Sequence, residues 1–129
     1  MIPAPRALAL VILLAGALGL PAAAPATTTA DAVNGDGQCS LREAVIRANS
    51  DVSIDGECDP GPPGADVIVL GAGTYRLAVP GRGEDAGATG DLDVRSAVTI
   101  RGAGAGATTI DAGGIDRALD VLAAGDLRV

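Results

Sequence analysis

From residue 66 onward the chain consists of short apolar runs separated by glycine-rich turns, and this spacing limits the fold more than any other feature. Strands are predicted at 66–70, 74–79, 92–94, 98–100, 108–110, 119–122 and 127–129. The unbroken run at 66–70 is typical of a strand that is buried on both faces. No helix-length periodic segment separates the runs, which excludes a doubly wound βαβ fold and leaves a mainly β sandwich, barrel or solenoid.

A weak internal repeat favours the solenoid among these three. Leu92-Asp93-Val94 recurs as Leu119-Asp120-Val121, and the Val-x-Ile of 98–100 is echoed by the Leu-x-Val of 127–129. This period suits one coil of a solenoid whose strands stack on their equivalents in the next coil. The sequence stops inside the second copy, so we expect it to be the front of a longer protein.

One helix is predicted, at 41–50. Ser40 and Glu43 have the spacing of a capping box, in which each side chain accepts a hydrogen bond from the other's backbone N–H. Apolar residues at i, i+3, i+4 and i+7 from Leu41 form one stripe. Arg42, Glu43, Arg47 and Asn49 lie outside that stripe, so they are expected to face water.

The N-terminal segment, residues 1–26, is typical of a secretory signal peptide. It has one arginine, a continuous apolar run over 7–20 and small residues suited to cleavage after residue 24 or, preferably, 26. The apolar run is short for a membrane span, which disfavours an uncleaved anchor. The protein is therefore expected to be secreted or at the cell surface, with its first strand within the threonine-rich 27–33.

Cys39 and Cys58, the only two cysteines, are predicted to form a disulfide in an exported chain. The alternative, a reactive or metal-binding thiol pair, lacks histidine and the CxxC spacing. Loss of Arg6 with the signal leaves eight Arg against sixteen Asp and Glu, a net charge of −8. This charge and the near absence of aromatic residues exclude nucleic acid as an expected partner.

Several motifs carry the resemblance to a known family. CSLREA at 39–44 is preceded by NGDG and followed by VIRAN, and downstream lie DVIVL at 66–70, GTY at 73–75, VTIRG at 98–102 and TID at 109–111. This pattern resembles the CSLREA domain, the N-terminal region of exported bacterial proteins with right-handed parallel β-helix, pectin-lyase-like repeats. The resemblance implies a cap at 27–65, made of a strand and the helix, on the first β-helix coils at 66–129. It implies no catalytic residue.

Acidic residues near the cysteines are weak calcium candidates. Asp36 lies in a partial match to an EF-hand loop, which also uses Asn34, Gly37 and Glu43 but has alanine at its first position. The other candidates are Asp55, Glu57 and Asp59. No other cofactor is expected.

Two further motifs are interpreted structurally. The GAGAGA run at 102–107 fits a dinucleotide fingerprint, but a strand follows it rather than a helix, so no nucleotide is expected. Asp91 and Asp93 stand two residues apart at a predicted strand, so both can face outward on the same side of it. There they could act on a sugar as an acid and a base. Outward-facing solvated acids are the preferred interpretation.

The sequence therefore favours an exported structural, surface-display or adhesive β-helix protein, with extracellular polysaccharide or cell-surface components as candidate partners. Two alternatives remain: the N-terminal part of a polysaccharide lyase or hydrolase of pectin-lyase-like fold, and a calcium-dependent extracellular interaction module.

Overall fold

A computed structural model describes residues 23–52, 56–58 and 65–129 of the 129-residue chain. Within them the chain is mainly β with one α-helix, as predicted. The elements are β1 (Ala23–Pro25), α2 (Leu41–Ser50), β2 (Asp66–Val69), β3 (Gly73–Arg76), β4 (Leu92–Val94), β5 (Ala97–Arg101), β6 (Thr108–Asp111), β7 (Leu119–Val121) and β8 (Asp126–Arg128).

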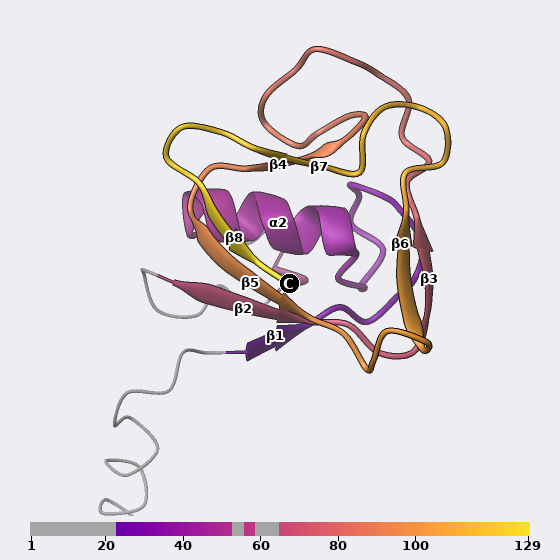
Figure 1. The fold of residues 1–129 in the computed structure, drawn as a ribbon. Helices are drawn as coiled ribbons and strands as arrows, with labels where there is room; N and C mark the ends of the chain where they lie inside the picture. The colour runs from indigo at the N-terminus through magenta and orange to yellow at the C-terminus, as the bar shows by residue number, and fades with distance from the viewer. Residues whose placement is uncertain (1–22, 53–55, 59–64) are drawn as a thin grey trace, which may run out of the picture.

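The strands form three small sheets in which every pairing is parallel. One sheet has the order β1-β2-β5-β8, and the other two are the pairs β3-β6 and β4-β7. Each strand from β2 to β5 therefore pairs with the strand three places later in the chain. In Figure 1 the three sheets surround helix α2.

The register of these pairs confirms the internal repeat. Leu92, Asp93 and Val94 of β4 lie beside Leu119, Asp120 and Val121 of β7, and Val98 of β5 lies beside Leu127 of β8. Equivalent residues of the repeat thus occupy neighbouring strands, as parallel in-register stacking requires.

The core is almost wholly aliphatic and lies between the sheets and the helix. Leu92 and Val94 are fully buried, and Asp93 between them points the opposite way, as strand alternation requires. The cluster also contains the helical stripe and one aromatic residue: Leu41, Ala44, Val45, Ala48, Ile68, Leu70, Tyr75, Leu77, Val98 and Ile100. Ile68 and Leu70 are buried on one face of this run and Val67 on the other, as predicted for a strand covered on both faces, although Val69 is half-buried.

Helix α2 begins and ends as predicted. Ser40 Oγ accepts a hydrogen bond from Glu43 N at 3.1 Å, and Glu43 Oε2 accepts one from Ser40 N at 2.9 Å, which completes the capping box. Asp51 ends the helix in the left-handed region at φ 56°, with its N–H bonded to the Arg47 carbonyl.

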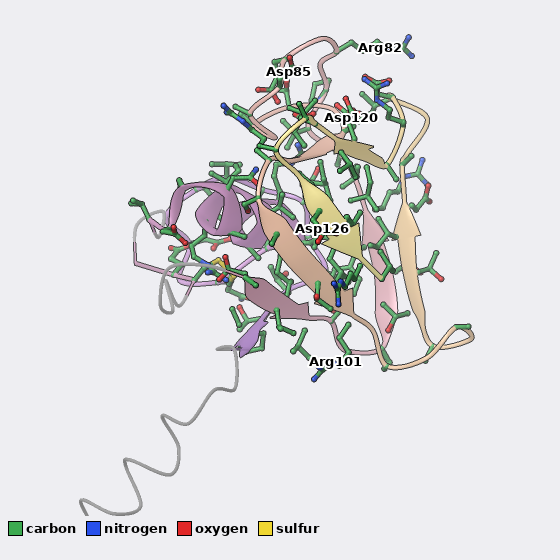
Figure 2. All side chains as sticks on the ribbon, turned by 60° about the vertical axis from the view of Figure 1, so that its left-hand side comes forward. Arg82, Asp85, Arg101, Asp120 and Asp126 are labelled. Atoms are coloured by element: carbon green, nitrogen blue, oxygen red, sulfur yellow. A yellow bond between two sulfur atoms is a disulfide. The ribbon has the colours of Figure 1, made fainter. Side chains whose placement is uncertain are left out.

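The prediction that the polar residues of the helix face water was wrong for most of them. Arg42, Glu43 and Arg47 are no more than 1% exposed, and Asn49 is half-buried. The helix lies at one end of the strand stack in Figure 2, and its polar face is covered by the segment before the helix, the 80–91 loop and the start of β2. Each of these buried charges has a specific hydrogen-bonding partner.

The predicted first strand at 27–33 was also wrong, because the first strand is β1 and pairs with β2. The threonine segment instead bonds to the residue before the helix cap: Thr27 N donates to Cys39 O at 2.8 Å, and Cys39 N donates to Thr27 Oγ1 at 2.7 Å. β1 falls inside the segment assigned to the signal peptide, and residues 1–22 of that segment lie outside the described residues.

Among the described residues, no helix has the length and apolar character needed to cross a membrane.

Candidate functional site

Arg42 connects helix α2 to two distant segments of the chain. Its guanidinium bonds to the Asp31 carboxylate twice, Nε to Oδ1 at 2.6 Å and Nη2 to Oδ2 at 2.9 Å. The same group donates to the carbonyl oxygens of Gly87 at 2.8 Å and Gly90 at 2.7 Å. A guanidinium offers five N–H donors in one plane, so it can satisfy a carboxylate and two carbonyls together. Arg42 thereby joins the segment before the helix to the loop at 80–91.

Asp31 is the acceptor on which this connection depends. Its side chain is 3% exposed. Burial acts to raise its pKa, but the bond from Arg42 and the N–H groups of Ala78 and Val79, at 2.6 and 3.0 Å, outweigh burial and hold the pKa below its ordinary value. Asp31 therefore remains charged while the chain is folded near neutral pH.

The second half of the helix is bonded to the strands. Arg47 Nη1 and Asp66 Oδ1, at the start of β2, lie 2.5 Å apart in a buried ion pair. Asn49 Nδ2 donates to the Asp93 carbonyl at 2.7 Å, and Asn49 Oδ1 accepts from Arg95 N at 2.8 Å. The helix is thus held to β2 and β4 by polar contacts as well as by its apolar stripe.

The predicted Cys39–Cys58 disulfide is present, with both sulfur atoms in the buried core and a Cα–Cα distance of 5.0 Å. It joins the residue preceding the helix cap to the segment after the helix.

The predicted calcium candidates are not brought together as a metal site by the residues described. Asp36 accepts from Gln38 N, and Glu57 accepts from Gly37 N at 2.5 Å. Both oxygens of Glu43, the last position of the partial EF-hand match, are occupied by Ser40 N and Asn34 N. Asp55 and Asp59 lie outside the described residues.

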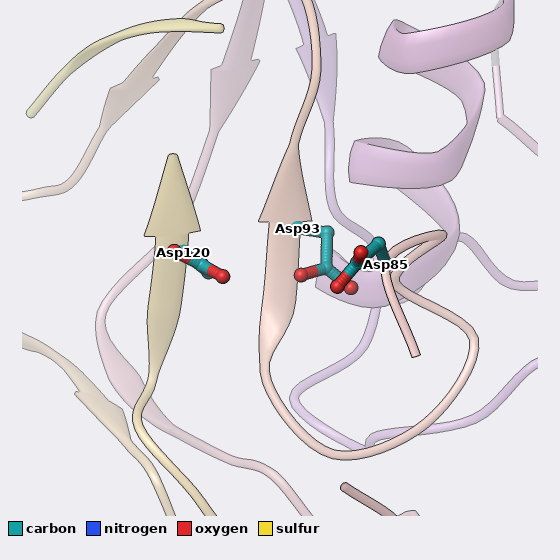
Figure 3. A group of neighbouring side chains, drawn as sticks. All are labelled: Asp85, Asp93 and Asp120. Atoms are coloured by element: carbon teal, nitrogen blue, oxygen red, sulfur yellow. The ribbon is translucent and has the colours of Figure 1, made fainter. Parts of the chain in front are cut away.

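A different acidic group is assembled by the fold. Asp85 on the 80–91 loop, Asp93 on β4 and Asp120 on β7 each place one carboxylate oxygen within 4.8 Å of the other two. Figure 3 shows the Asp93 carboxylate between the other two side chains. Asp93 and Asp120 are an in-register pair. Asp85 and Asp120 were not predicted as site residues. The Leu-Asp-Val repeat could have indicated Asp120, because two copies stacked in register place their aspartates side by side.

The prediction that Asp91 and Asp93 are solvated acids was wrong. Both point away from the core interior, but they are 2% and 0% exposed. Asp93 Oδ2 accepts from Gly87 N at 2.8 Å, so the 80–91 loop covers it. Asp91 Oδ2 accepts from Arg117 Nε at 2.8 Å, and Arg117 Nη2 lies 3.0 Å from Asp120 Oδ2. These bonds raise the pKa of Arg117, the Asp91 bond most strongly.

The outer part of the loop at 80–91 extends away from the strands in Figure 1. Its inner part is fixed by hydrogen bonds. Gly90 N donates to Val79 O at 2.9 Å, and Glu84 accepts from the N–H groups of Ala86 and Thr89, both at 3.0 Å. Against the effect of burial, these backbone donors lower the pKa of Glu84. Gly87 has φ +78°, a conformation that L side chains rarely adopt, so glycine is required where the loop meets Asp93.

A cavity of about 710 Å³ is formed mainly by β5, β6 and β7, which are here called the second set of strands, and by the β5–β6 turn. Ile100, Ile110 and Leu119 contribute its apolar lining together with Leu70, Ala105 and Val129. Ile110 and Leu119 are only half-buried, whereas their counterparts Tyr75 and Leu92 in the preceding strands are covered. The apolar interior is therefore closed where helix α2 lies and open at the second set of strands.

Comparisons of the chain with protein-family models, with curated proteins and with solved structures gave no match in any of the three.

Proposed function

We propose that this chain is the capped N-terminal end of an exported right-handed parallel β-helix, and that it has a structural, surface-display or adhesive role. The arrangement of helix α2 carries the proposal. The helix contacts β2, β4 and β5 and covers the interior at that end of the stack, while Ile110 of β6 and Leu119 of β7 are only half-buried beside an open cavity. This is what the end of a coiled stack of strands needs, because an uncovered end exposes apolar side chains.

The order of strand pairing supports the β-helix part of the proposal. The chain passes through the three sheets in turn and then returns to the first, so that β2, β5 and β8 stack in one sheet. The succession of parallel partners three strands apart is the pairing that a three-sided coil produces. The capping residues of 39–44 then serve as the CSLREA resemblance implies, with Arg42 and Glu43 as buried anchors rather than as a solvated face.

Export is supported by the apolar segment at the N-terminus and by the buried disulfide, since disulfides persist in oxidising compartments. Asp91 and Asp93 do not support the alternative of a polysaccharide-acting enzyme. Asp91 forms an ion pair with Arg117, and Asp93 is covered by the 80–91 loop. An acid and base acting on a polysaccharide must contact it.

Export is tested by producing the full chain with a C-terminal tag in a bacterial host and fractionating the cells. We expect the tagged protein outside the cytoplasm, with a mature N-terminus at Thr27 by mass spectrometry. Cleavage there removes β1 with the signal, so that β2 becomes the edge strand of its sheet. A control with Leu13 and Leu14 replaced by arginine should remain in the cytoplasm. Cytoplasmic retention of the parent with residues 1–26 intact would contradict the export proposal.

Strand stacking is tested separately by paired cysteines. Thr74 of β3 and Thr109 of β6 are exposed and lie in register. The T74C/T109C variant should therefore form an intramolecular crosslink with a short bismaleimide. The matched variant T74C/T99C, whose second cysteine lies on β5 in another sheet, should not. Equal crosslinking of both variants would contradict the stacking.

A further inference from the structure

The acidic group of Asp85, Asp93 and Asp120 is assembled from three separate segments. Asp85 comes from the 80–91 loop, and the two strand residues come from β4 and β7. Figure 2 shows Asp85 and Asp120 at the same end of the molecule, with Asp126 farther away on β8. The convergence of three carboxylates is unfavourable without a positive partner, because like charges at close range repel.

The state of Asp93 is an independent observation that points to a ligand. Its side chain is fully buried, and Oδ2 accepts the bond from Gly87 N. Oδ1 is also buried, yet none of the described residues bonds to it. Leaving a buried carboxylate oxygen without a partner is costly. In Figure 3 this carboxylate lies between those of Asp85 and Asp120, so a cation bound to it can contact all three.

The ligand must be a cation, because every side chain in the group is a carboxylate. Oxygen ligands alone suit a hard divalent ion rather than zinc, which favours nitrogen and sulfur. Ca²⁺ binds oxygen at about 2.3–2.6 Å, so two of its ligands can stand up to about 5 Å apart. Mg²⁺ binds at about 2.1 Å and needs its ligands within about 4.2 Å of one another. The three oxygens lie within 4.8 Å of one another, which is within the span of a calcium ion. Calcium also accepts irregular coordination by carboxylates from separate segments, whereas Mg²⁺ demands near-ideal octahedral geometry.

The surrounding charges leave this group strongly negative. Glu84 and Asp91 add negative charge near Asp93, and among the described residues Arg117 is the cation that forms an ion pair with a member of the group, Asp120. Arg117 takes one oxygen of Asp120, Oδ2. Burial most of all, and then Asp91, Glu84 and Asp85, raise the pKa of Asp93 to about 6.

We propose that Asp85, Asp93 and Asp120 bind one Ca²⁺ ion, which fastens the 80–91 loop to β4 and β7. Solvent completes the coordination on the side of Asp85, the exposed member of the group. The site is separate from the calcium candidates around Asp36 and Glu57, and it does not depend on the structural or adhesive role of the chain.

The experiment is a calorimetric titration of CaCl₂ into the full oxidised chain at pH 7.5, after exhaustive treatment with a chelator. We expect one ion per chain and at least tenfold weaker binding of MgCl₂. D93N and D120N should each weaken calcium binding at least tenfold. D126N removes an exposed acid of β8 and should bind as the parent does.

D85N changes only an exposed loop residue, so it tests the site in a variant whose fold is undisturbed, as a far-UV circular dichroism melt will verify. It should also weaken binding at least tenfold. The proposal is overturned if the parent binds no calcium at millimolar concentration, if D85N and D93N bind as the parent does, or if D126N weakens binding as much as they do.

Discussion

Replacing Arg42 by methionine should destabilise the chain strongly, because the change leaves a buried carboxylate without its counterion. Methionine keeps much of the apolar stem but removes the guanidinium. Asp31 then stays buried and unpaired, and the carbonyls of Gly87 and Gly90 lose their donors. Removing one partner of a buried ion pair costs about 3–5 kcal/mol. A domain of this size has a free energy of unfolding of about 5–15 kcal/mol, so R42M should lose a large share of it.

The assay is urea denaturation of the oxidised chain at pH 7, followed by far-UV circular dichroism. R101M is the control, because Arg101 is exposed, and it should change the free energy of unfolding by less than about 0.5 kcal/mol. The double variant D31N/R42M should be more stable than R42M, since it no longer buries an unpaired charge. An R42M variant within about 1 kcal/mol of the parent, or a double variant no better than R42M, would refute the reasoning.

Three further predictions concern the cap, the disulfide and pH. S40A should lower the free energy of unfolding by about 1–2 kcal/mol, because it removes the helix cap and also the hydrogen bond from Ser40 Oγ to Ala32 O at 2.7 Å. The control is S50A at the exposed end of the helix. Equal melting temperatures of the two variants would contradict the role of the cap. Reduction of Cys39–Cys58 should lower the thermal midpoint, since closing a loop of this length is worth about 3 kcal/mol; an unchanged melt after confirmed reduction would count against it. The folded pKa of Asp93, about 6, exceeds its unfolded value, so without calcium its contribution is present below about pH 4 and is lost as the pH rises through 6. D93N should therefore gain on the parent as the pH rises from about 4 to 7, by up to about 3 kcal/mol in total, and a stability gap that does not change with pH would contradict this.

Local signals were sufficient to predict the helix and most of the strands. The capping box gives the start of α2 at Leu41, and the Leu-Asp-Val repeat gives the bounds and the pairing of β4 and β7. Both depend on residues close in sequence or on a copied pattern. The Cys39–Cys58 bond followed from there being only two cysteines.

The features that were missed depend on tertiary partners. Periodicity treats Arg42 as a polar residue and assigns it to solvent, because the pattern contains no information about Asp31 or the loop carbonyls that bond to it. The threonine segment has high β propensity, yet Thr27 bonds to Cys39 instead of to a strand. Burial of Asp93 depends on how the 80–91 loop folds back, and no local signal gives that.

Stacking a repeat in register explains why the acidic group exists and why it needs a counterion. Identical apolar residues gain from lying side by side, as Leu92 and Leu119 do, but identical acids repel. On the neighbouring sheet the register pairs Arg76 with Asp111, 3.7 Å apart, and the charges balance.

Asp93 and Asp120 have no such balance, because Arg117 reaches Asp120 and Asp91 but no bond joins it to Asp93 among the described residues. Protonation of Asp93 relieves the repulsion only below about pH 6. Above that pH a bound cation relieves it instead. Calcium binding and protonation of Asp93 should therefore both stabilise the parent by relieving this repulsion. Saturating calcium should then abolish the greater free energy of unfolding of D93N over the parent at pH 7.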